Sequence, residues 1–92
     1  MANVVVTIRI MPTSPDVDLG VIEEEAKKKI REFTGIDEFR TSIEPIAFGL
    51  KALMITFLSP EEKGDTEPLE KELEGIEGVE SIQVIDVRRA VG

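Results

Sequence analysis

The chain has 92 residues, which suits a single domain spanning residues 1–92, and 41% of them are apolar, which is enough for one modest core. It contains no histidine and no cysteine, so imidazole bases, thiolate nucleophiles, disulfides and Cys/His zinc sites are all excluded. The net charge of −8 disfavours direct binding to nucleic-acid phosphates and suits either plain solubility or a basic protein partner.

The first regular element is predicted as a strand at residues 3–11, because Val4, Val6, Ile8 and Ile10 alternate on one face. Two prolines, Pro12 and Pro15, then end this strand.

The first ten residues lack a basic start followed by a long apolar stretch, and no apolar run in the chain approaches the about 20 residues needed to span a bilayer. We therefore expect a cytoplasmic protein with neither a signal peptide nor a membrane segment.

A helix is predicted next, capped by Asp16 or Asp18 and ended by Gly35. Its apolar stripe repeats at three and four residues and consists of Leu19, Ile22, Ala26, Ile30 and Phe33. The two aspartates fit a helix cap better than a metal site. We expect neither a metal ion nor a cofactor.

Two strands joined by a tight turn are predicted at residues 40–48 and 50–58. Pro45 lies in the first strand, and because proline supplies no ladder donor, it favours an edge position. Gly49 permits the reversal. The second strand is apolar on both faces, as expected in the centre of a sheet. Its two faces are Leu53, Ile55 and Phe57 on one side and Ala52, Met54 and Thr56 on the other.

Residues 59–65 are predicted as a turn, followed by a second helix and a last strand at residues 79–88. Asp65 or Thr66 can cap this helix, and Gly75 and Gly78 are its two candidate ends. Its buried stripe is expected to contain Leu69, Leu73 and Ile76.

The order strand-helix-strand, strand-helix-strand predicts an α+β fold, the ferredoxin-like βαββαβ sandwich. Right-handed crossovers place both helices on one face of a four-stranded antiparallel sheet, with the first and third strands in the centre. Val5, Thr7 and Arg9 should then share the open face with Ala52, Met54 and Thr56. That face is either a docking surface or an ordinary solvent face of mixed polarity.

Two short segments stand out as candidate partner-binding sites. The first is the hairpin tip, where Phe48 and Gly49 precede Lys51. Phe48 either anchors the domain in a pocket of a partner or folds back onto the core. The second is the carboxy-terminal segment 86–92, where Arg88 and Arg89 either pair with a carboxylate or phosphate or form a frayed basic tail.

Short stretches spread over nearly the whole chain also carry a family likeness. They are Met-Pro at 11–12, SPDVDL at 14–19, EPIAFGL at 44–50, GIEGV at 75–79 and DVRR at 86–89. With these stretches in this order, the chain resembles archaeal elongation factor 1-beta, the guanine-nucleotide exchange factor for the GTPase elongation factor 1-alpha. That family is short and ferredoxin-like, which agrees with the fold derived from the element order.

The resemblance implies a function without covalent chemistry. An exchange factor of this family binds its GTPase in the GDP-bound and nucleotide-free forms and promotes GDP release and GTP loading during translation elongation. In eukaryotic relatives an aromatic-glycine hairpin, matched here by Phe48 and Gly49, contacts the GTPase. Those relatives also bring a carboxy-terminal lysine toward the Mg²⁺ region. This chain has Arg88 and Arg89 there and no lysine beyond Lys71.

Two other function classes remain as alternatives. Domains of this topology also serve as small-ligand regulatory modules, although fold alone is only an analogy for function. An enzyme using an Asp/Glu pair is the weakest hypothesis, because no particular pair among the 19 acidic residues is singled out. We expect a non-enzymatic domain without direct contact to nucleic acid or membrane.

Overall fold

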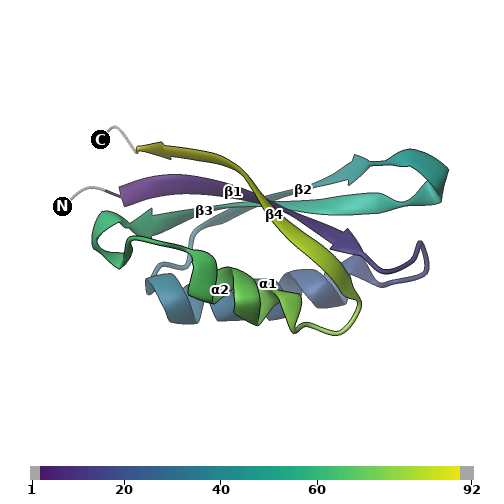
Figure 1. The fold of residues 1–92 in the computed structure, drawn as a ribbon, viewed down its shortest axis with the longest axis horizontal. Coiled ribbons are helices and arrows are strands. Elements are labelled where there is room, and N and C mark those ends of the chain that lie inside the picture. The colour runs from purple at the N-terminus through teal and green to yellow at the C-terminus, as the bar shows by residue number, and fades with distance from the viewer. Residues whose placement is uncertain (1–2, 90–92) are drawn as a thin grey trace.

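The computed structural model describes residues 3–89 and has the predicted element order, with two helices packed on one face of a four-stranded sheet (Figure 1). The ferredoxin-like α+β prediction is confirmed. Residues 90–92, the end of the predicted basic tail, lie outside the described part. The elements are β1 (Asn3–Pro12), α1 (Leu19–Thr34), β2 (Phe39–Pro45), β3 (Lys51–Pro60), α2 (Glu67–Glu74) and β4 (Val79–Arg89).

The sheet has the strand order β2-β3-β1-β4, and all neighbouring strands are antiparallel. The predicted central position of the first and third strands is therefore confirmed. β2 lies at one edge and ends at Pro45, where the missing backbone donor interrupts no inner ladder. β4 forms the other edge and shifts register between Thr7 and Ile8 of β1, which leaves Ile85 as an extra residue.

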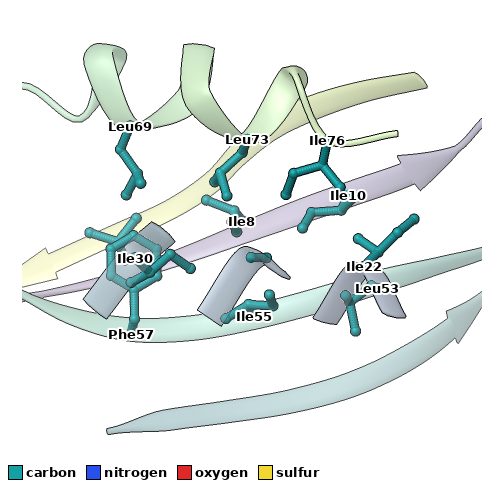
Figure 2. Packing of buried hydrophobic residues seen from close by; sticks show 12 residues of the cluster. Ile8, Ile10, Ile22, Ile30, Leu53, Ile55, Phe57, Leu69, Leu73 and Ile76 are labelled. Atoms are coloured by element: carbon teal, nitrogen blue, oxygen red, sulfur yellow. The ribbon is translucent and has the colours of Figure 1, made fainter. Parts of the chain in front are cut away.

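The core lies between the sheet and the two helices, as Figure 2 shows for Leu73 of α2, which points toward Ile8 of β1. Truncation of a fully buried leucine to alanine typically costs about 2–5 kcal/mol, so this layer dominates the stability. The buried cluster consists of Val6, Ile8, Ile10, Ile22, Ala26, Ile30, Leu53, Ile55, Phe57, Leu69, Leu73 and Ile76.

Local hydrogen bonds define the helix ends. Of the two predicted caps of α1, Asp18 makes the bond: its Oδ1 accepts from the N–H of Gly20 at 2.9 Å. Gly35 ends α1 in the left-handed conformation. At α2 the carboxylate of Asp65 accepts the N–H of Glu67 at 2.9 Å. The predicted stripe of Leu69, Leu73 and Ile76 is buried. Its last residue, Ile76, follows the end of α2 at Glu74.

Two predicted boundaries are wrong. The strand predicted at 40–48 ends at Pro45, because the chain needs residues 46–50 to reverse. The turn predicted at 59–65 begins later, because β3 continues to Pro60 and its Ser59 pairs with Val4 of β1. Among residues 3–89, no helix is both long and apolar enough to cross a membrane.

Candidate partner-binding site

The β2–β3 hairpin reverses through two residues in the left-handed region. The N–H of Ile46 donates to the carbonyl of Leu50 at 2.8 Å, and the N–H of Leu50 donates to the carbonyl of Ala47 at 3.2 Å. Between these bonds lie Phe48, with φ 60° and ψ 34°, and Gly49, with φ 77°. Glycine adopts this conformation freely, whereas a bulky residue is strained in it.

Phe48 points into solvent, with 94% of its surface exposed, so the alternative in which it folds onto the core is wrong. A non-glycine residue in the left-handed region costs about 1–2 kcal/mol. Burial of the ring does not offset this cost. A side chain that is both strained and unburied contributes nothing to folding, and such residues concentrate at functional sites.

The hairpin borders a groove of about 490 Å³, which it shares with the loop between β1 and α1. The structure thus brings the predicted Gly49 and Lys51 beside the loop that carries the SPDVDL motif, which is distant from them in the sequence. Ile43 adds a half-exposed apolar side chain to this groove. Other lining residues include Pro12, Pro15 and Leu19.

The GIEGV stretch packs against the loop between β1 and α1. The N–H of Thr13 donates to the carbonyl of Gly78 at 2.9 Å. Gly78 has φ +93°, and a Cβ added there would lie 3.0 Å from Cγ1 of Val17. Only glycine allows this backbone conformation and this close approach together. Stretches from three separate parts of the chain therefore meet at the hairpin end of the domain.

Arg88 and Arg89 lie at the opposite end of the sheet. Arg88 pairs with Val5 of β1, which in turn pairs with Leu58 of β3. Leu58 follows Gly49 by nine residues, most of them in β3, which corresponds to about 30 Å at the rise of a strand. Figure 1 shows β4 ending beside the start of β1, far from the β2–β3 turn. The five predicted site residues thus form two clusters.

Both arginines are held by carboxylates rather than frayed. Nε of Arg88 lies 2.7 Å from Oδ2 of Asp86, and Nη2 of Arg89 lies 2.7 Å from Oε1 of Glu61. These exposed pairs are worth about 0–1 kcal/mol each, so a partner's carboxylate can compete for either guanidinium at little cost.

The open sheet face also carries Arg9 and Arg40, of which Arg40 was not recognised from sequence. Nη2 of Arg9 lies 3.7 Å from Oε1 of Glu44, and its Nη1 donates to Gln83 at 3.4 Å. The pairing of Arg40 with Thr56 places it on the same face. Sequence could have indicated this only through the alternation of β2, because the register decides which residues of β2 face outward.

Within residues 3–89 no group of three or more histidine, cysteine, aspartate or glutamate residues is arranged to hold a metal ion. The geometry that stands out is an exposed, strained aromatic at a hairpin tip, next to a groove, on a two-layer scaffold. These features are typical of a domain that docks onto another protein.

Comparison with known proteins identifies the family. The family model described as "EF-1 guanine nucleotide exchange domain" matches residues 5–90. The chain belongs to this family.

Individual relatives agree over nearly their whole length. Elongation factor 1-beta of Methanothermobacter thermautotrophicus is 47% identical over 89 residues, covering 97% of this chain and 98% of the relative. The protein of the same name from Methanosarcina barkeri is 46% identical over 90 residues, covering 97% and 99%. That from Staphylothermus marinus is 41% identical over 90 residues, covering 97% and 98%.

The solved structure of BlrP1 BLUF has a TM-score of 0.57 at 14% identity and covers all of this chain and 57% of that one. This likeness concerns the fold alone. The family match confirms the resemblance seen in the sequence and supports a guanine-nucleotide exchange role, with elongation factor 1-alpha as the partner. The small-ligand module is not favoured.

Proposed function

We propose that this domain binds elongation factor 1-alpha in its GDP-bound and nucleotide-free states and accelerates GDP release, so that GTP can bind. The observation that carries the proposal is the match of residues 5–90 to an exchange-domain family. The exposed, strained Phe48 supplies a physical means of docking. The site of action is the cytoplasm, during translation elongation.

Exchange by such a domain is a linkage effect. An exchange domain that lowers the affinity of the GTPase for GDP is itself bound more weakly when GDP is present. The two affinities fall by the same ratio. Both complexes must therefore form, and the nucleotide-free complex is the tighter one. No bond is made or broken, so the domain acts without being an enzyme and needs no metal or cofactor of its own.

The hairpin cluster and the arginine cluster are assigned different contacts. Phe48, supported by Gly49 and Lys51, is the apolar anchor. Arg88 and Arg89 are the polar contacts, about 30 Å from it along the sheet. They act as docking cations for carboxylates rather than as substitutes for a lysine, because the planar guanidinium differs from an ammonium in reach and geometry.

The charge of the domain disfavours nucleic acids and membranes as partners. With a net charge of −8, it is repelled by nucleic-acid phosphates and by anionic lipid surfaces. We therefore propose a protein partner only.

The test is the release of a fluorescent GDP analogue from the cognate elongation factor 1-alpha, measured with excess unlabelled GDP. The expected result is an exchange rate that rises and saturates with the concentration of the domain. Unchanged release at a concentration of the domain that saturates binding would refute the proposal. Unchanged release without any binding would refute the partner as well.

A further inference from the structure

We infer that the open face of the sheet is itself a docking surface, which lies against an acidic patch of the GTPase while the helices face solvent. This inference rests on the proposed function and deepens it. It assigns contacts to Arg9, Arg40 and Arg88, which the strand register places on one face.

The distribution of charge is the first argument. Three arginines and two carboxylates, Glu44 and Asp86, lie on the open face. All other positions, including those on the helix side of the strands, hold the remaining eight basic and seventeen acidic residues. Even when Glu38, which flanks β2, is assigned to this face, the face is neutral and the rest of the chain carries the whole net charge of −8. Approach to an acidic surface is therefore less opposed through this face than through the rest of the domain.

The kind of cation is the second argument. All six lysines lie outside the registered positions of this face, which carries only arginine. Arginine suits contact surfaces because its flat, weakly hydrated guanidinium binds carboxylates through two parallel hydrogen bonds. Arg9 already lies across β3 toward Glu44, and Ala52 of β3, which pairs with Glu44, is fully buried.

Size is the third argument. Four strands about 4.8 Å apart and about eight residues long cover roughly 500 Å². A standard interface buries about 800 Å² on each partner, so the face supplies more than half of that area and the hairpin tip extends it. The face also connects the two clusters of the proposed site, because Arg88 lies on it and β3 runs along it to the hairpin. A single partner that contacts both clusters passes over it.

The composition of the face favours a protein over a nucleic acid. Its central side chains are Val5, Thr7, Met54, Thr56 and Leu58, all half-buried, and the hydroxyl oxygens of Thr7 and Thr56 lie 3.0 Å apart. No aromatic residue occupies its registered positions, so it offers no platform on which bases could stack.

The absence of native cysteine allows a direct test by protection of single cysteines from alkylation. Ser42→Cys introduces a thiol at an exposed position of the open face, and Lys28→Cys introduces the control thiol on the outer side of α1. With saturating nucleotide-free GTPase, alkylation of Ser42→Cys should slow at least tenfold while that of Lys28→Cys stays unchanged. Equal reactivity of Ser42→Cys in the free and bound domain would overturn the inference.

A matched pair of charge reversals supplies the second readout. Arg40→Glu on the open face and Arg31→Glu on α1 change the net charge equally. Arg40→Glu should raise the concentration for half-maximal exchange about tenfold, an effect that added salt weakens, and Arg31→Glu should change it less than twofold. Equal effects of the two would overturn the inference, as would protection of Ser42→Cys by single-stranded RNA without the GTPase. If wild-type exchange persists in these cases, the proposed function survives the loss of this inference.

Discussion

Phe48 provides the sharpest test of the docking mechanism, because its effects on folding and on binding should separate. The ring is 94% exposed, so Phe48→Ala removes almost no burial and should change the free energy of unfolding by less than about 0.5 kcal/mol. Burial of a phenylalanine in a partner's pocket contributes about 2–3 kcal/mol. The variant should therefore need about 30- to 140-fold more protein for half-maximal exchange.

The assay combines GDP-analogue release from elongation factor 1-alpha with urea denaturation of the domain alone. Phe48→Gly serves as the companion variant, because glycine relieves the left-handed strain. It should be more stable than Phe48→Ala by about 1 kcal/mol and equally defective in exchange. Val87→Ala is the control: it truncates another exposed apolar side chain, which the pairing of Val87 with Val6 places on the helix side of β4, far from the hairpin tip, and it should leave exchange unchanged.

The reasoning fails if Phe48→Ala reaches half-maximal exchange at the wild-type concentration. It fails equally if the variant loses several kcal/mol of stability, because the ring would then be part of the fold. A defect shared by Val87→Ala would show that exposed apolar surface in general, rather than the anchor, drives association.

Three further substitutions test how the fold supports this end of the domain, each by urea denaturation. Gly78→Ala should cost about 1–3 kcal/mol, because its positive φ strains alanine and the new methyl group would press on Val17; a neutral change would contradict the conformational argument. Ser59→Ala should raise stability by up to about 1 kcal/mol, because the buried Oγ has no hydrogen-bond partner within residues 3–89; a clear loss would point to a bond at that oxygen. Asp18→Ala should cost about 1 kcal/mol as the lost helix cap, whereas Asp16→Ala should be neutral, and equal costs would contradict the capping assignment.

The β/α order, the central strands and the core were predictable from the sequence because they depend on local patterns. Alternation in residues 3–11 and the stripe from Leu19 to Phe33 report which side chains avoid water. Pro45 indicated an edge strand through its missing donor, and the prediction holds. The boundaries were less accurate: neither the end of β2 at Pro45 nor the extension of β3 to Pro60 follows from propensity, because pairing with a neighbouring strand decides where each strand stops.

The candidate site divides in the same way. Composition excluded nucleophiles, and the family motifs indicated Phe48 and the terminal arginines, because residue identity alone carries that information. Three facts were decided only by tertiary structure: that Phe48 is exposed and strained, that Arg88 lies about 30 Å from it, and that Arg9, Arg40 and Arg88 share one face. Each depends on strand register and on the path of a turn, and these are set by contacts between residues distant in the chain.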